Sequence, residues 1–326
     1  MNRVFLFINL VVLLLVLLCS CSMTEASNYN YESVDNGQNN FLAGGNMAFK
    51  DNTLYVSAVS DVSQKSKTLA INNKGVKLLN TTNDSKGYIF GIPTFYQTKD
   101  KLYVDGYELN TNDNSLKKAD KKTINNLYNL DYLSDDLVVE SLTYGSKLKI
   151  TYHEKTYTLK QDYRNLCVGN NKVYCIDSDE ELYCFDPEKR KRFEYFADTM
   201  RDSDLLFWAC GGCVYYNAIG EPNSQYGDDR ADSGLYCYCE KNKSHKLIIQ
   251  GGIKSLNSYD DTLYVAADSG VYKCKKDKVK KLCGEKADEI YILDKTWIYG
   301  LNRSNATVFR VAQNGSKTER VPLNIK

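Results

Sequence analysis

The chain has 326 residues, and its 42 Lys and Arg nearly balance its 41 Asp and Glu, which leaves a net charge of +1. That balance argues against a nucleic-acid-binding protein, which carries a basic excess to replace phosphate counterions. The 26 tyrosines and 4 prolines favour β-strands, and the 2 histidines argue against a His-rich zinc enzyme or a Ser-His-Asp hydrolase.

The chain begins with an apolar segment that has the features of an export signal. Arg3 supplies a positive charge, and the run from Val4 to Leu18 is polar only at Asn9. This run is short for a membrane span, which needs about 20 residues. It ends in Leu18-Cys19-Ser20-Cys21, which resembles the lipobox of bacterial lipoproteins. The resemblance implies a signal peptide at 1–20, lipidation of Cys21, and an extracytoplasmic protein anchored to the cell membrane by acyl chains such as palmitate. An uncleaved anchor helix and ordinary secretion are the alternatives.

Residues 21–40 separate this signal from the remainder of the chain. After Cys21 they read SMTEASNYNYESVDNGQNN, with three acidic residues, no Lys or Arg and no apolar periodicity. We expect a flexible tether that holds a folded domain away from the membrane.

From residue 41 onward the sequence repeats with a period of about 40 residues. The repeated segment, here called the core motif, has the form Asp-x-apolar-Tyr-apolar, and its seven copies centre on Tyr55, Tyr103, Val138, Tyr174, Tyr215, Tyr264 and Ile298. A strand-like segment precedes each copy, and one or two more follow it, separated by turns rich in Gly, Asn or Asp. Four short strands in about 40 residues are typical of a propeller blade. The sequence therefore predicts an all-β, seven-bladed β-propeller of four-stranded blades over residues 41–326, with six or eight blades as alternatives.

The lipobox, the tether and the repeats resemble one group of bacterial lipoproteins. The repeats that carry the likeness are of the kind DTLYV at 261–265 and GLYCYC at 234–239. Propellers of this group are described as low-density-lipoprotein-receptor-related-protein-like, or as a domain of unknown function, and occur mostly in low-GC Gram-positive bacteria. The resemblance implies fold and location, but it carries no catalytic residue and no cofactor.

Nine cysteines lie in the repeated region, all between residues 167 and 283. Cys210-Gly211-Gly212-Cys213 is predicted to form a hairpin turn in which the two cysteines face each other as unpaired thiols, a disulfide, or a metal or redox pair. Cys175 aligns with Val56 and Val265, which predicts a small buried apolar filler. Cys184, Cys237, Lys273 and Arg310 align in one column, which we expect to face solvent or to lie at a blade edge because it accepts Lys and Arg.

Two further segments are candidates for binding. The fifth unit contains an additional segment at 218–233, and its candidate ligand-binding residues are Tyr226, Asp228, Asp229, Arg230 and Asp232. A tolerated insertion is the alternative. Six lysines between 273 and 281 form either a patch for anionic lipids or cell-wall polymers, or the solvated outer hairpin of a blade.

These features favour a membrane-anchored, extracytoplasmic module, monomeric and without metal or cofactor, that binds or scaffolds a protein, peptide or glycan. The alternative is an extracytoplasmic carbohydrate-active lyase or hydrolase with its site at the propeller axis. No acid–base pair can be located from the sequence, and two tryptophans are too few for a quinone-cofactor propeller.

Overall fold

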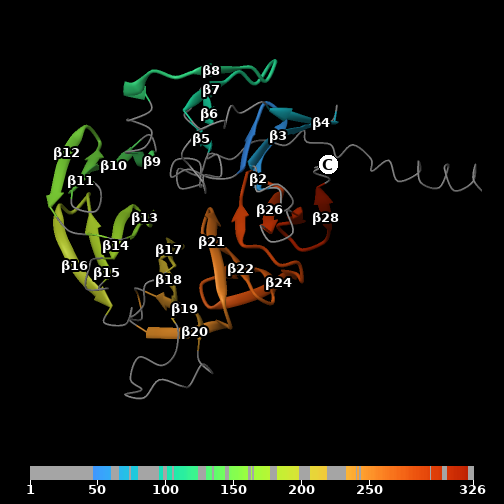
Figure 1. Ribbon diagram of the computed structural model, residues 1–326. Coiled ribbons are helices and arrows are strands. Elements are labelled where there is room, and N and C mark those ends of the chain that lie inside the picture. The colour runs from blue at the N-terminus through green and yellow to red at the C-terminus, as the bar shows by residue number, and fades with distance from the viewer. Residues whose placement is uncertain are drawn as a thin grey trace, which may run out of the picture.

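The computed structural model describes residues 47–59, 66–72, 75–79, 95–97, 101–104, 106–123, 130–133, 136–143, 147–160, 163, 165–176, 182–197, 206–218, 233–239, 241, 244–293, 295–302 and 307–321. These residues form seven four-stranded sheets, and each sheet is made of strands that are consecutive in the chain. All strand pairs are antiparallel. The sheets are arranged around a common centre, with the first strands inside and the fourth strands outside (Figure 1). The predicted seven-bladed propeller is confirmed.

The strand bounds are as follows. Blade 1 contains β1 (Met47–Lys50), β2 (Thr53–Val59), β3 (Ser66–Asn72) and β4 (Gly75–Leu79). Blade 2 contains β5 (Phe95–Gln97), β6 (Leu102–Val104), β7 (Tyr107–Leu109) and β8 (Leu116–Lys118). Blade 3 contains β9 (Leu130–Leu133), β10 (Leu137–Thr143), β11 (Lys147–Tyr152) and β12 (Lys155–Lys160). Blade 4 contains β13 (Asn165–Gly169), β14 (Lys172–Ile176), β15 (Leu182–Asp186) and β16 (Lys191–Ala197).

The last three blades follow the same order. Blade 5 contains β17 (Phe207–Cys210), β18 (Cys213–Ala218), β19 (Gly234–Cys239) and β20 (Ser244–Gln250). Blade 6 contains β21 (Ile253–Tyr259), β22 (Thr262–Ala267), β23 (Gly270–Lys275) and β24 (Lys278–Cys283). Blade 7 contains β25 (Glu289–Tyr291), β26 (Trp297–Asn302), β27 (Thr307–Ala312) and β28 (Thr318–Val321).

The core motif forms the second strand of every blade. This strand is covered on both faces by neighbouring blades, so its residues are apolar without alternation, and all three residues of β6 are buried. The fourth strand lies at the rim, and four consecutive residues of β24 are exposed. The motif tyrosines pair with the third strand, as Tyr264 does with Lys273. In blade 7 the residue at this position is Tyr299, opposite Arg310, and not Ile298 as predicted. Four residues separate Asp294 from Tyr299, which is two more than in the Asp-x-apolar-Tyr form of the core motif.

Hydrophobic clusters join six of the seven pairs of neighbouring blades in the part of the chain that the structure describes. Separate clusters join blades 3 and 4, 4 and 5, 5 and 6, and 6 and 7. A fifth cluster contains residues of blades 7, 1 and 2, among them Tyr299, Tyr55 and Leu102. The ring is thus closed between blades 7 and 1 by side-chain packing, while the sheets of both blades keep their own four strands.

One glycine is fixed by the close approach of two inner strands. At Gly169 in β13, a Cβ atom would lie 1.8 Å from the backbone oxygen of Ala209 in β17. Nearby, the amide of Ala209 donates to the Cys167 sulfur over 3.3 Å. Blades 4 and 5 therefore meet backbone to backbone, which only a residue without a side chain permits.

A recurring polar contact also joins neighbouring blades. The motif tyrosine of one blade donates its hydroxyl proton to the turn between the third and fourth strands of the next blade. The three pairs are Tyr55 to Asn114 Oδ1 at 3.2 Å, Tyr215 to the Lys276 oxygen at 3.3 Å, and Tyr264 to Gln313 Oε1 at 2.9 Å. A lysine of the fourth strand contacts the same turn in each case. These pairs are Lys77 to the Asp113 oxygen at 3.0 Å, Lys246 to Asp277 at 2.8 Å, and Lys280 to the Asn314 oxygen at 2.8 Å. We call this arrangement the tyrosine–lysine contact.

The prediction that the aligned column on the third strands faces solvent is wrong for two of its four residues. Arg310 is 4% exposed and Cys237 is 3% exposed, whereas Cys184 and Lys273 are half-buried. The column faces the next blade, so its burial depends on that neighbour and not on the residue type. Arg310 is accommodated because it donates to Glu319 and stacks on Trp297, with 4.3 Å between the guanidinium carbon and the ring centre. Cys175 is fully buried, as predicted.

Candidate functional site

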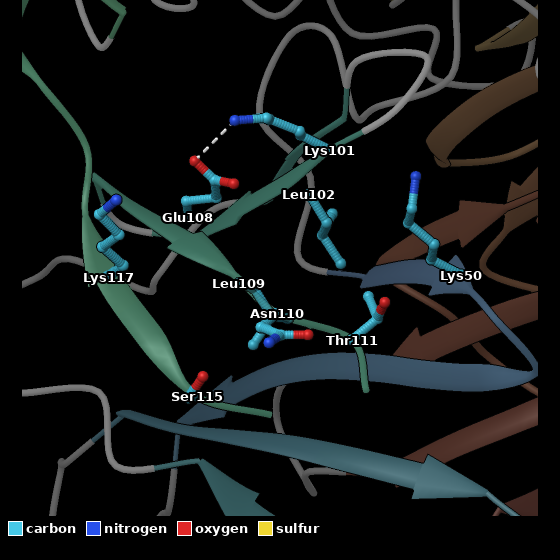
Figure 2. Close-up of a pocket in the computed structure, with 9 residues that line it drawn as sticks. All are labelled: Lys50, Lys101, Leu102, Glu108, Leu109, Asn110, Thr111, Ser115 and Lys117. Atoms are coloured by element: carbon cyan, nitrogen blue, oxygen red, sulfur yellow. Dashed lines mark hydrogen bonds and ion pairs between the residues drawn. The ribbon is translucent and has the colours of Figure 1, made fainter. Parts of the chain in front are cut away.

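A pocket of about 410 Å³ lies between blades 1 and 2. One lining residue, Lys50, belongs to blade 1 and ends β1. The other eight belong to blade 2, where they come from the start of β6 and the residue before it, from β7, from the loop at 110–115 and from β8. The lining residues are Lys50, Lys101, Leu102, Glu108, Leu109, Asn110, Thr111, Ser115 and Lys117. Figure 2 shows Lys50 and Lys117 on opposite sides of the pocket, with Leu102 and Leu109 between them.

The loop at 110–115, with the sequence NTNDNS, forms one wall of the pocket and is held by hydrogen bonds within itself. The Asn110 amide donates to the Ser115 oxygen over 2.9 Å, and the Asn114 amide donates to the Asn110 oxygen over 2.8 Å. Side-chain oxygens of Asn110 and Asp113 accept further backbone protons within the loop. Asn114 adopts a φ of 60°, which asparagine tolerates better than most residues.

The same loop is held against blade 1. Tyr55 and Lys77 donate to it through the tyrosine–lysine contact, and the Thr111 hydroxyl donates to the Asp51 carboxylate in the β1–β2 turn. Burial raises the pKa of Tyr55 to about 12, so its hydroxyl keeps its proton and remains a donor at neutral pH. One wall of the pocket is therefore held in place by hydrogen bonds to blade 1.

The charges of the pocket are unbalanced. Three lysines line it against one carboxylate, that of Glu108, which pairs with Lys101 at 2.9 Å (Figure 2). Within the part of the chain that the structure describes, the ammonium groups of Lys50 and Lys117 make no ion pair or hydrogen bond. Two uncompensated positive charges thus lie beside the buried side chains of Leu102 and Leu109.

The donor set matches an anion. Two ammonium groups, the Ser115 hydroxyl and the side-chain amide of Asn110 can donate to carboxylate, phosphate or sulfate oxygens, whereas the Thr111 hydroxyl already donates to Asp51. Among the nine lining residues, Glu108 is the one carboxyl group, and it is already paired with Lys101. The pocket therefore holds the groups for binding an anion but no second carboxyl with which Glu108 could share acid–base chemistry.

The Cys210–Cys213 turn lies at the interface of blades 4, 5 and 6. Gly211 and Gly212 have φ values of 58° and 74°, and Cys210 and Cys213 are register partners across this two-residue turn. Asn170 of blade 4 accepts from the Gly212 amide at 2.9 Å and donates to the Cys213 oxygen at 3.3 Å. No disulfide joins the nine cysteines of the described region. In that region no group of three or more His, Cys, Asp or Glu is placed to hold a metal ion.

Other predicted site residues lie outside the described residues. They are the lipidation site Cys21 and the candidate loop residues Tyr226, Asp228, Asp229, Arg230 and Asp232. The lysine-rich segment at 273–281 is described, and it forms the end of β23, a turn and the exposed strand β24 at the rim of blade 6. The described part of the chain contains no helix with the length and hydropathy of a membrane span.

The fold defines the class of the protein as a seven-bladed β-propeller. The chain matches no known family profile and no curated protein sequence. Among solved structures it is similar to YCF48 bound to D1 peptide, with 10% identity over 87% of this chain and 95% of that chain, and a TM-score of 0.48. It is also similar to BamB from Moraxella catarrhalis, with 10% identity over 83% and 85% of the two chains and a TM-score of 0.43. A third similar structure is PorZ, a surface component of the type-IX secretion system of Porphyromonas gingivalis, with 10% identity, 83% and 38% coverage and a TM-score of 0.43.

Proposed function

We propose that this chain is a lipid-anchored, extracytoplasmic binding module whose propeller recognises an acidic segment of a protein, peptide or glycan. The observation that carries the binding role is the pocket between blades 1 and 2, where Lys50 and Lys117 have no anionic partner. A protein leaves two ammonium groups of one pocket without an ion pair at little cost only where solvent or a ligand anion neutralises them.

The binding role is tested with a fluorescent, glutamate-rich peptide and, in a parallel arm, an oligosaccharide of uronic acids. Anisotropy measures the Kd of the full chain for each probe. The variant that carries Lys50→Gln and Lys117→Gln loses two charge-assisted contacts, so its affinity should fall by about tenfold or more. The probe for which the variant's affinity falls, peptide or oligosaccharide, identifies the ligand class.

The matched control carries Lys275→Gln and Lys278→Gln. These exposed lysines pair in register at the rim of blade 6, and the control changes the net charge by the same amount. Its affinity should stay within about twofold of wild type, because exposed charges beyond a Debye length of about 8 Å are screened. An equal loss in both variants would show that the probe responds to overall charge, and the proposed pocket would be rejected.

The anchor is tested separately. The Leu18-Cys19-Ser20-Cys21 sequence supports lipidation at Cys21, so Cys21→Ala should abolish labelling with a palmitate analogue and shift the protein out of the membrane fraction. Cys19→Ala is the control and should be labelled like wild type. Labelling that survives Cys21→Ala contradicts the anchor while leaving the pocket untouched.

A further inference from the structure

The interface of blades 5 and 6 contains an unusual concentration of thiols. The face of blade 5 that carries Trp208 and Tyr215 packs on blade 6, since Trp208 Nε1 donates to Ser258 Oγ at 2.8 Å. Strand register places four cysteines on this face, namely Cys210, Cys213, Cys237 and Cys239. Cys274 of blade 6 belongs to the same hydrophobic cluster.

Register separates the cysteines that can be joined from those that cannot. Cys210 and Cys213 close a two-residue turn, so they form a hydrogen-bonded pair and the backbone groups of Cys213 point toward β17. Toward β19, Cys213 is therefore in a non-hydrogen-bonded pair with Cys239. Such pairs bring Cα atoms to about 4.5 Å and side chains closer than hydrogen-bonded pairs do. A disulfide needs Cβ atoms about 3.5–4.5 Å apart, which favours Cys213–Cys239 over Cys210–Cys213.

The remaining nearby cysteine is a diagonal neighbour. Cys237 pairs in register with Tyr215, so it is offset by two residues from the partner of Cys213. Diagonal neighbours have Cα atoms about 7–8 Å apart, which is beyond the usual disulfide range of about 4.4–6.8 Å. Both Cys237 and Cys239 influence the pKa of the Cys213 thiol, but only Cys239 has the backbone spacing for a covalent bond.

The two register partners differ in access to solvent. Cys213 is fully buried, whereas Cys239 ends its strand and is half-buried. Hydrogen bonding to Cys237 and burial raise the pKa of Cys213, so its thiol stays protonated and does not start an exchange reaction. Cys239 is thus the position at which an external reagent enters.

We propose that Cys213 and Cys239 form a thiol–disulfide exchange site that reacts with a low-molecular-weight disulfide. The Cys239 thiolate attacks one sulfur of the disulfide RSSR, forming a mixed disulfide and releasing one thiolate RS⁻. Cys213 then gives its proton to the first released thiolate RS⁻, its own thiolate attacks the Cys239 sulfur and closes the Cys213–Cys239 bond, and the second thiolate leaves and takes a proton from solvent. The two cysteines are oxidised together by two electrons, and one RSSR is reduced to two RSH.

The bond would join β18 to β19 and enclose the segment at 219–232 that separates them. Cross-linking residues 213 and 239 removes freedom mainly from the unfolded chain, so oxidation should raise the Tm. In an oxidising environment the disulfide would therefore form and stabilise blade 5, while the pairing of β18 with β19 stays the same.

The test treats the full chain with glutathione disulfide, traps remaining thiols with N-ethylmaleimide, and digests with trypsin. Cleavage after Arg201, Arg230 and Lys241 puts Cys210 and Cys213 in one peptide and Cys237 and Cys239 in the next. Oxidation should link the two peptides and lower their summed mass by about 2 Da relative to the reduced pair. Cys283 is an internal control, because its register partner is Val271 and it can form only a glutathione adduct.

Variants assign the bond. Cys239→Ser, at a half-buried position, should abolish the link, and Cys237→Ala and Cys210→Ala should retain it. A disulfide within the 202–230 peptide, loss of the link in Cys237→Ala, or a Cys239 that stops at the glutathione adduct would each overturn the proposal. None of these outcomes depends on the anionic pocket.

Discussion

Substituting Tyr264 by Phe removes one hydroxyl from the tyrosine–lysine contact between blades 6 and 7 and leaves the packing of the ring intact. Tyr264 is 1% exposed, and its hydroxyl donates to Gln313 Oε1 at 2.9 Å. Burial raises the pKa of Tyr264, so the donor is present at any pH near neutrality. A hydrogen bond of this kind contributes about 0.5–1.5 kcal/mol net, and Gln313 is half-buried, so water can satisfy its oxygen. We therefore expect Tyr264→Phe to cost about 1 kcal/mol.

Denaturant unfolding measures this free energy, and a double-mutant cycle with Gln313→Ala isolates the contact. The coupling free energy should be about 0.5–1 kcal/mol, because the two side chains bond to each other directly. Tyr272→Phe is the matched control, since its exposed hydroxyl bonds to Ser269 within blade 6, and it should cost less than about 0.5 kcal/mol. A coupling free energy near zero would refute the view that motif tyrosines join the blades by hydrogen bonds.

Three further changes probe the fold. Gly169→Ala should cost about 3 kcal/mol or more in denaturant unfolding, because its Cβ would overlap the Ala209 oxygen, whereas Gly284→Ala, with no atom within 4 Å of its Cβ, should cost less than about 1 kcal/mol. Glu319 is partly buried, which opposes ionisation, but hydrogen bonds from Lys317 and Arg310 outweigh this and lower its pKa. Its contribution to stability is therefore complete above the ordinary carboxyl pKa and disappears as the pH falls through the lowered value, so Glu319→Gln should destabilise the protein at pH 7 and less at pH 3. Deleting 286–326 removes blade 7, including Tyr299, Leu301 and Val308 of the hydrophobic cluster that it shares with blade 1, so light scattering should detect aggregation, and a soluble folded product would contradict ring closure.

The number and order of the blades could be predicted because the apolar residues of the core motif reflect the burial of the second strand. A strand covered on both faces needs consecutive apolar residues, and a run of three such residues, for example Leu102-Tyr103-Val104, recurs in each unit. The position of Tyr299 was missed because spacing was counted from Asp294, whereas register depends on pairing with Arg310. The burial of Arg310 was missed for a related reason, since it depends on the neighbouring strand and on Glu319.

The pocket could not be predicted, because its residues share no spacing. Lys50 belongs to one repeat and Lys117 to the next, and they meet only when the 110–115 loop is held against blade 1. The sequence drew attention to Cys210 and Cys213, which are separated by two glycines. The partner of Cys213 in the further inference is Cys239, and only strand register brings those two residues together. The candidate residues at 226–232 and Cys21 remain predictions.

Closure of the ring by side chains alone has a consequence for the order of the chain. Among the described residues, each sheet is made of four strands consecutive in the chain, and blades 7 and 1 exchange no strand. Hydrogen bonding within the sheets therefore does not depend on which blade is synthesised first. A circular permutant opened at Gly251-Gly252, with residues 321 and 47 joined by a linker, would preserve every sheet. Any blade could therefore come first in the chain without changing the sheets. This arrangement is expected when whole blades are duplicated or transposed as units.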